Sequence, residues 1–592
     1  MFNQSFFEES IDTFYKMNSI ALDCSKKTID SIPEINKIIQ KTTPAINEVQ
    51  DSFQKWGESI VKNPKHNQNK QQEFLNKLTQ LQSYITNKIV NKETEKVIQE
   101  SPNDKRFKHK DWEENLYFDS LKQFYLLFAK WFENTIEDQP DLEEKNKKKV
   151  LFHAKQLTSA LSPNNFLATN PEVLEATINE KGNNLKKGFN KLINDLKEGS
   201  GQLKISQSSN QTLKIGENMA TTKGKIIFQN QYFELIQYEP STKEIYQTPI
   251  LIVPPFINKY YILDINKQKS FVKPLIKEGF TVFMMSWVNP DESYRNTTFD
   301  DYVINGVEKA LNIIKHQLFA KEIHTIGYCV GGTLLTTTAA YLAKKGTTSI
   351  KSMTLLSTFT DFENVGEMEI FITEKQITAL EAVMEEKGYF DDKYLYDTFN
   401  SLKSNDLLWP FLIQNYLLGK EPKSFDILFW NSDGIRLPEK LYSQYLRQFY
   451  LNNALSNESL IINNETLNLN DINCDAFLVA SKNDHIVPWE SSFVFHKNHT
   501  KNSTFVLNSG GHISSVAHNI ETNKQTYQCS KSKRMTKKWL KEIETKEGSW
   551  FYDWYDWLKG RSGSLKTSKK VSEYRRKTIE DAPGTYVLKT NK

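Results

Sequence analysis

Three polar residues in the second half of the chain have the side chains needed for nucleophilic catalysis. Cys329 lies in the segment Gly-Tyr-Cys-Val-Gly-Gly (327–332), Asp484 in Ser-Lys-Asn-Asp-His (481–485) and His512 in Asn-Ser-Gly-Gly-His (508–512). An ionised thiol is a strong nucleophile, a histidine can take up its proton, and a carboxylate can orient that histidine. These residue types therefore predict chemistry through an acyl thioester.

Each of the three residues follows a short apolar segment with the composition of a buried strand. These segments are residues 322–328, 476–480 and 504–507. In an open α/β sheet, reactive groups gather at the carboxyl ends of the strands. We therefore expect the three side chains to meet at one edge of a sheet, in the chain order nucleophile, acid, histidine that α/β-hydrolases use.

The turn around Cys329 has the pattern of a nucleophile elbow with cysteine in place of serine. A strand is followed by the turn G-x-C-x-G and by a helical pattern over residues 333–345. The small neighbours tolerate the strained backbone that such a turn requires. The helix N-terminus and His512 are expected to stabilise the thiolate, and the backbone N–H groups of Val330 and Phe256 are the predicted oxyanion donors.

The same segments allow other interpretations. A glycine turn beside an inert, buried cysteine would need no catalysis. His485 adjoins Asp484, but it begins the segment Ile-Val-Pro-Trp (486–489), where packing or capping is the expected role. Asp475 and Cys474 precede their strand and so belong at the wrong end of the sheet. Residue type, order and strand-end placement together favour the triad.

The fold class follows from the pattern of elements around these segments. Between about residues 226 and 357, strands alternate with helices after an initial hairpin, which predicts a doubly wound α/β sheet with right-handed crossovers. Residues 359–470 are helical and rich in aromatic side chains, and we interpret them as a cap over the site. The prediction is an α/β-hydrolase fold with this inserted cap and a helical N-terminal domain, divided into residues 1–205 and 206–592.

The N-terminal region is polar and helical in pattern. Five apolar residues recur there at helical spacing: Phe2, Phe6, Phe7, Ile11 and Phe14. They indicate an amphipathic arm that packs on its own domain or a partner, or that binds an apolar surface. We interpret the stretches 61–76 and 143–149 as solvated connectors, and the basic segment 559–577 as a solvated tail, with attraction of phosphate as the alternative for the tail.

Composition narrows the possible functions. The 592 residues include 76 basic and 72 acidic side chains, a net charge of +4 that gives no reason to expect nucleic-acid binding. The 4 cysteines are far apart, which fits a reducing cytoplasm better than a disulfide framework. We expect no signal peptide, no transmembrane segment and no metal site.

Several longer segments match one known family in order. They are Ser-Pro-Asn-Asn-Phe-Leu-Ala-Thr-Asn-Pro (162–171), Leu-Ile-Val-Pro-Pro-Phe-Ile-Asn-Lys-Tyr-Tyr-Ile-Leu-Asp (251–264), Ser-Trp-Val-Asn-Pro (286–290), the cysteine segment 327–332, Asn-Asp-Leu-Leu-Trp (405–409), Asn-Tyr-Leu-Leu-Gly (415–419), Phe-Trp-Asn-Ser-Asp (429–433), Asp-His-Ile-Val-Pro-Trp (484–489), Gly-His-Ile (511–513) and Glu-Asp-Ala-Pro-Gly (580–584). Through them the chain resembles class I polyhydroxyalkanoate synthases over about residues 150–592. The resemblance implies polymerisation of (R)-3-hydroxyacyl-CoA, with 3-hydroxybutyryl-CoA as the expected monomer, and release of CoA.

The resemblance also implies roles for individual residues. Cys329 would carry the acyl thioester, His512 would activate it, and Asp484 would help to activate the 3-hydroxyl, directly or through His512. Lys403 stands where the family has arginine, which keeps the charge but loses the bidentate fork. Lys403 and Trp430 are assigned to substrate or CoA binding. No cofactor is implied, since the CoA thioester is the substrate, and the expected form is a cytoplasmic homodimer on polyester granules with granule-associated proteins.

Two other functions share parts of this pattern. A cysteine-dependent thioesterase or ester hydrolase would use the same triad. A granule-coat or scaffold protein could keep the fold without catalysis. Cysteine favours the synthase, because transfer from one thioester to another keeps the acyl group activated for attack by a hydroxyl, whereas hydrolysis needs only serine.

Overall fold

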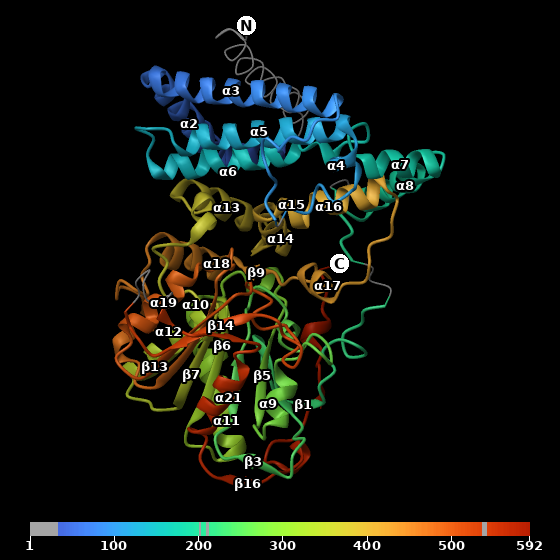
Figure 1. Cartoon of the computed structure of the whole chain (residues 1–592). Coiled ribbons are helices and arrows are strands. Elements are labelled where there is room, and N and C mark those ends of the chain that lie inside the picture. Colours follow the sequence, from blue (N-terminus) through green and yellow to red (C-terminus); the bar gives the residue numbers. More distant parts are fainter. Residues whose placement is uncertain (1–32, 103, 200–202, 209–211, 535–541, 592) are drawn as a thin grey trace.

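The structure of the chain is a computed structural model, which describes residues 33–102, 104–199, 203–208, 212–534 and 542–591. The expected amphipathic arm at residues 2–14 lies outside the described residues. Three layers follow one another in Figure 1: N-terminal helices, a helical cap, and a large sheet flanked by helices.

The described residues contain an 11-stranded sheet in the order β15-β14-β13-β12-β7-β6-β4-β5-β2-β1-β17. Its strands are β1 (Gly224–Gln229), β2 (Phe233–Tyr238), β4 (Ile250–Val253), β5 (Val282–Trp287), β6 (Ile323–Tyr328), β7 (Ile350–Leu356), β12 (Asp475–Ser481), β13 (Ser503–Asn508), β14 (Thr526–Ser530), β15 (Thr545–Glu547) and β17 (Glu580–Asp581). From β13 to β5 neighbouring strands are parallel, and the pairs at both edges are antiparallel. The predicted hairpin, β1–β2, and the predicted parallel strands are confirmed.

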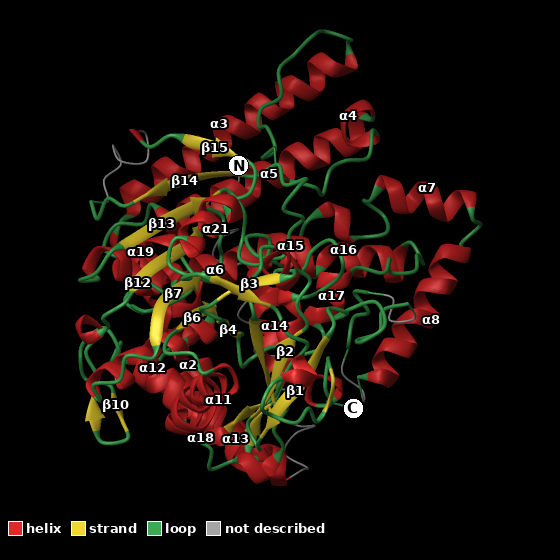
Figure 2. Ribbon diagram, turned by 90° about the horizontal axis from the view of Figure 1, so that it is seen from below, coloured by secondary structure: helices red, strands yellow, loops and turns green. Residues whose placement is uncertain are grey.

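Both faces of the sheet are covered, which explains the continuous apolar composition of its central strands. Alternate residues of β4 enter two separate cores. Ile250 and Ile252 pack with α9 (Val272–Lys277) and α21 (Phe551–Lys559), whereas Leu251 and Val253 pack with α11 (Lys309–Leu318) and α12 (Val330–Lys344). Figure 2 shows α21 and α11 on opposite sides of the strands.

The cap is inserted between β7 and β12 and lies above the sheet in Figure 1. Its helices are α13 (Glu374–Lys387), α14 (Asp392–Leu402), α15 (Ser404–Leu407), α16 (Trp409–Leu412), η6 (Ile413–Leu417), α17 (Asp426–Asn431), α18 (Glu439–Gln444) and η7 (Tyr445–Leu451). The helical composition predicted for this insertion is therefore confirmed.

A buried ion pair anchors the cap to the sheet domain. Lys259 Nζ lies 2.6 Å from Asp433 Oδ1, and these side chains are only 1% and 15% exposed. The hydroxyl of Tyr261 donates to the other oxygen of Asp433 at 2.8 Å. The indole N–H of Trp430 donates to the carbonyl of Lys259 at 2.8 Å, and Asn258 pairs with Gly434 in an antiparallel bridge. The segment that follows β4 is thus fixed to the end of α17.

The N-terminal helices are α2 (Pro33–Lys62), α3 (Pro64–Ile89), α4 (Asp111–Glu114), α5 (Leu116–Glu137), α6 (Glu144–Ala160), α7 (Pro171–Asn179) and α8 (Asn183–Glu198). Most of them lie on the far side of the cap from the sheet, whereas α7 and α8 lie beside α16 of the cap (Figure 1). Glu48 joins this layer to the cap, because its carboxylate pairs with Lys149 and accepts a hydrogen bond from Thr373. None of the described helices is both long and apolar enough to cross a membrane.

Three segments expected to be connectors or a tail instead contain regular structure, although most of their side chains are exposed to solvent as expected. Residues 61–76 fall largely in α3, and residues 144–149 begin α6. Lys149 is 3% exposed because the carboxylate of Glu48 compensates its charge. In the basic C-terminal segment, Leu565–Thr567 forms strand β16 against β3 (Glu244–Tyr246), and Arg561 pairs with Asp475 at 2.8 Å.

Candidate active site

Cys329 occupies a strained turn between a strand and a helix. Strand β6 ends at Tyr328, α12 begins at Val330, and Cys329 between them has φ 53° and ψ −130°. A side chain at positive φ is unfavourable unless the surroundings enforce it. The sequence predicted this elbow, but the helix starts three residues earlier than its pattern indicated, so that Gly331 and Gly332 lie inside its first turn.

The glycines of the elbow are required by close packing. A Cβ on Gly327 would come within 3.0 Å of Gly332 Cα, and one on Gly331 would do the same to the carbonyl oxygen of Pro254. A Cβ on Gly332 would collide with the side chain of Thr358. The absence of these side chains lets α12 start directly against the ends of β4 and β6.

His512 stands between the other two residues of the predicted triad. Its Nδ1 lies 2.8 Å from Asp484 Oδ2, and its ring lies beside Cys329 on the wall of the same cavity. The second carboxylate oxygen of Asp484 accepts the backbone N–H groups of Ile486 and Val487, each at 2.9 Å. The three residues, which are far apart in the sequence, are therefore brought together as predicted.

Burial and charge shape the protonation of this pair. Burial opposes the charged form of His512, but attraction to Asp484 and Cys329, together with the hydrogen bond to Asp484, raises its pKa to about 10. Burial likewise opposes the charge on Asp484, yet His512 and the two backbone N–H groups hold the pKa of this carboxyl below its ordinary value. The geometry thus favours an imidazolium paired with a carboxylate.

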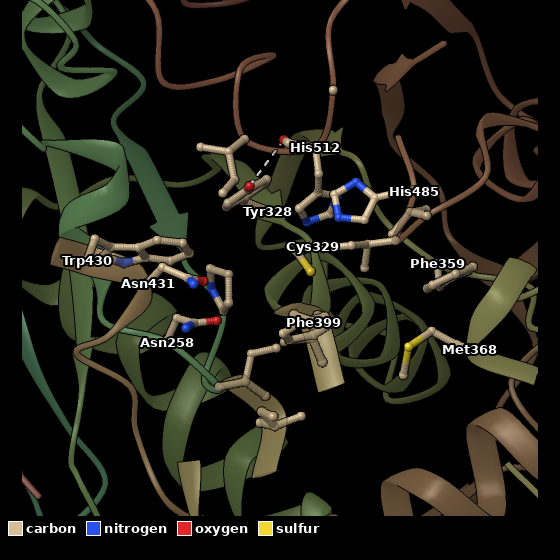
Figure 3. Close-up of a pocket in the computed structure, with 18 of the residues that line it drawn as sticks. Asn258, Tyr328, Cys329, Phe359, Met368, Phe399, Trp430, Asn431, His485 and His512 are labelled. Atoms are coloured by element: carbon tan, nitrogen blue, oxygen red, sulfur yellow. Dashed lines mark hydrogen bonds between the residues drawn. The ribbon is translucent and has the colours of Figure 1, made fainter. Parts of the chain in front are cut away.

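The backbone of the histidine loop is also held in place. The hydroxyl of Tyr328 donates to the carbonyl oxygen of His512 at 3.2 Å, as Figure 3 shows, and Ser515 donates to the same oxygen at 3.0 Å. The loop follows β13, just as the loop with Asp484 follows β12. The imidazole is therefore positioned from both its ring and its main chain.

The side chains of Cys329 and His512 line a cavity of about 310 Å³ between the sheet and the cap. Most of its wall is apolar, and most of that apolar surface comes from the cap: Phe359, Met368, Ile372, Leu395, Phe399, Leu407, Ile427, Leu428, Trp430, Tyr442, Tyr445, Leu446 and Tyr450. Such a lining excludes water and suits an acyl chain.

The other predicted site residues fall in different places. Val330 lines the cavity, and its N–H, as the first of α12, has no acceptor inside the helix. The ring of Phe256 is fully buried, while its neighbours Pro255 and Ile257 line the cavity. Trp430 also lines it, but the exposed side chain of Lys403 does not. The oxyanion and binding roles of these residues stay predictions.

His485 is closer to the chemistry than packing or capping would require. Its side chain lines the cavity beside Cys329 and His512 (Figure 3). Burial, with the positive charges of Lys403 and His512, lowers its pKa to about 4, so the ring is neutral at working pH. The neighbours Asp484 and His485 therefore differ in position: Asp484 pairs with His512, whereas the side chain of His485 faces the cavity.

Sequence reasoning did not single out four further polar residues of the cavity wall. Asn258 follows β4, Asn431 ends α17, and Tyr445 and Tyr450 project from the π-helix η7. Burial raises the pKa of both tyrosines. The sequence carries one signal that could have identified such residues: an asparagine within an otherwise apolar segment, as in Pro-Pro-Phe-Ile-Asn (254–258).

Comparisons with known proteins assign the chain to a family. A family described as the N-terminus of poly-beta-hydroxybutyrate polymerase (PhaC) matches residues 103–275, and the alpha/beta hydrolase fold matches residues 248–518. Poly(3-hydroxyalkanoate) polymerase from Methylorubrum extorquens is 40% identical over 496 residues, which cover 83% of this chain and 82% of that protein. The chain belongs to the poly(3-hydroxyalkanoate) polymerase family.

Two more relatives carry related names. The PhaC subunit of the polymerase from Rhizobium etli is 38% identical over 82% of this chain and 76% of its own length. The corresponding subunit from Cupriavidus necator is 35% identical over 82% of this chain and 83% of its own length. The predicted family, the α/β-hydrolase fold and the class of enzyme, an acyltransferase of the polymerase type, are confirmed.

Proposed function

We propose that this polymerase joins (R)-3-hydroxyacyl-CoA units, with 3-hydroxybutyryl-CoA as the leading substrate, through an acyl thioester on Cys329. The observation that carries the proposal is the position of His512, which is hydrogen-bonded to Asp484 and lines the same apolar cavity as Cys329. Nucleophile, base and orienting carboxylate are the parts that covalent acyl transfer requires.

In the first step, the Cys329 sulfur attacks the carbonyl carbon of the CoA thioester while His512 holds the proton of the thiol. The carbonyl oxygen becomes an oxyanion, for which the N–H of Val330 is the first donor and the N–H of Phe256 the second. The carbon–sulfur bond to CoA then breaks, and His512 returns the proton to the leaving CoA sulfur. The acyl group remains on Cys329 as a thioester.

In the second step, the 3-hydroxyl of another unit attacks the acyl thioester. His512 accepts the hydroxyl proton, an oxoester forms, and the Cys329 sulfur is released. The side chain of Asp484 is fully buried, and its oxygens already accept from His512, Ile486 and Val487. This arrangement supports action through His512 rather than direct contact with the hydroxyl.

The cap is proposed to keep water from the acyl-enzyme. Hydrolysis and chain extension differ only in which hydroxyl attacks, so the outcome depends on what reaches Cys329. Apolar side chains such as Phe399, Leu428 and Leu446 surround the cavity and favour a hydroxyacyl group over water. This is the feature that separates a polymerase from a thioesterase with the same triad.

We further propose that the enzyme acts as a homodimer at the surface of its polyester product in the cytoplasm, together with granule-associated proteins. Large apolar side chains are exposed on the N-terminal layer, including Phe124, Ile178 and Phe189. An insoluble polyester offers a surface on which such side chains can be buried. Sedimentation with and without polymer granules, and the mass in solution, test the two parts separately.

The proposal is tested by supplying purified protein with (R)-3-hydroxybutyryl-CoA and following free CoA and insoluble polyester together. CoA release matched by polyester, both lost in Cys329→Ala, is the expected result. Release matched by free 3-hydroxybutyrate would make the protein a thioesterase. Undiminished polymer from the alanine variant would overturn the role of Cys329.

A further inference from the structure

Besides its tyrosines, the cavity has two separate groups of polar side chains. One group surrounds Cys329 and contains His512 and His485; the other contains Asn258 and Asn431 beside Trp430 (Figure 3). The first group serves the chemistry described above. The second group is not needed for any of its steps.

The two asparagines come from opposite sides of the cap boundary. Asn258 belongs to the segment after β4, and Asn431 is the last residue of α17 in the cap. The bridge between Asn258 and Gly434, and the bond from Trp430 to the carbonyl of Lys259, hold these segments together. The carboxamides are therefore neighbours whose backbones are fixed.

Neither carboxamide is paired by the protein. Within the described part of the chain, the side chains of Asn258 and Asn431 make no hydrogen bond to another residue, although both are half-buried. Their neighbours on the cavity wall include the side chains of Ile257 and Leu428, which offer no polar atoms. The amide atoms of both asparagines are accessible from the cavity, so a ligand there can supply the partners that the protein does not.

The chemistry of a carboxamide specifies that ligand. Each asparagine presents two N–H donors and a carbonyl acceptor, so it is fully paired only by a group with both functions. A polyester offers carbonyl acceptors and no donors along its chain, and the 3-hydroxyl of the attacking unit is already assigned to His512. The pantetheine arm of a CoA thioester carries secondary amides, the first separated from the sulfur by a short ethylene spacer.

We propose that Asn258 and Asn431 form a subsite for the first amide of the pantetheine arm of the incoming thioester. The inference rests on the proposed use of a CoA thioester and deepens it. The subsite would orient the thioester sulfur toward Cys329 and would recognise the part of the substrate that leaves, not the part that is polymerised.

Two thioesters of (R)-3-hydroxybutyrate isolate this contact. The N-acetylcysteamine thioester carries the amide, and the 1-pentanethiol thioester replaces its N–H and carbonyl by methylene groups in a chain of equal length. Thiol release gives kcat/KM for each. Asn258→Leu and Asn431→Leu are each expected to lower kcat/KM about fivefold to tenfold for the amide substrate and to leave the pentyl substrate within about twofold.

Leu428→Ala is the matched control, because Leu428 lies on α17 with Asn431 and lines the same cavity. It is expected to change kcat/KM for both thioesters by one common factor. An equal loss with both thioesters in the asparagine variants would overturn the inference and leave the proposed function intact. If the wild-type protein released no thiol from these thioesters or from the CoA thioester, the proposed function would fall, and the inference with it.

Discussion

Asp484 approaches His512 Nδ1 at 2.8 Å with one carboxylate oxygen, while its other oxygen accepts two backbone N–H groups. The carboxylate is thus held by its own loop before it pairs with the imidazole. This arrangement fixes which nitrogen of His512 carries a proton toward Asp484 and which faces Cys329.

Asp484→Asn should lower kcat/KM by about 10²-fold to 10⁴-fold, because an amide no longer enforces the tautomer or stabilises the imidazolium. A rapid-quench experiment that separates the first release of CoA from later turnover tests how Asp484 acts. Both phases should slow, since both use His512. An unchanged first phase with slow later turnover would instead indicate direct action on the hydroxyl.

The raised pKa of His512 predicts how the pair contributes to stability with pH. A group with a raised pKa stabilises the folded state fully below its ordinary value of 6.5, and this contribution is lost as the pH rises toward about 10. The wild type should therefore be more stable than Asp484→Asn at pH 6.5, and this difference in unfolding free energy should decrease as the pH rises to about 10. Urea unfolding at a series of pH values measures it.

Asp475→Asn provides the control for this titration. Asp475 lies at the other end of β12 and pairs with Arg561, which remains charged throughout the same pH range. The stability difference for this variant should stay constant. If the difference in unfolding free energy between wild type and Asp484→Asn also stayed constant with pH, His512 and Asp484 would not form the inferred charged pair.

Gly332→Ala should disrupt the elbow. The added methyl group would collide with the side chain of Thr358, and overpacking of this kind costs about 1–3 kcal/mol. Activity should fall together with the unfolding free energy, because a shift of α12 displaces Cys329. The double variant Gly332→Ala/Thr358→Gly removes the collision and should recover part of both quantities, whereas no recovery would show that another contact limits this position.

Much of this site follows from local sequence. The strand, turn and helix around Cys329 are encoded by consecutive residues, and the strand ends before Asp484 and His512 are marked by apolar runs that stop abruptly. Such local patterns can be recognised without knowledge of the rest of the fold. The start of α12 was missed because glycines usually end a helical pattern, whereas here they permit close packing.

The remaining features depend on contacts between distant segments. Residues 61–76 form a helix although their composition is typical of a connector, because long polar helices are stabilised by the layers they pack against. Lys149 looks solvated until Glu48, about a hundred residues earlier, is placed beside it. The polar pair Asn258 and Asn431 becomes visible only when the cap is seated on the sheet domain.

The ion pair between Lys259 and Asp433 should be essential to that seating. Removing one partner of a buried pair leaves an uncompensated charge and costs about 3–5 kcal/mol, so Asp433→Ala should be strongly destabilised in urea unfolding. The double variant Lys259→Met/Asp433→Leu removes both charges and should regain most of that stability. A double variant as unstable as the single one would show that packing at this site, not charge, holds the cap.

The acyl-enzyme itself is the most direct test of the account. The protein would be mixed with (R)-3-hydroxybutyryl-CoA, quenched in acid, digested and examined by peptide mass spectrometry. Hydroxybutyryl units are expected on the peptide that contains Cys329; neutral hydroxylamine should release them, as it does a thioester, and they should be absent from Cys329→Ala. Acyl groups on another residue, or polymer formed without any acyl group on Cys329, would contradict it.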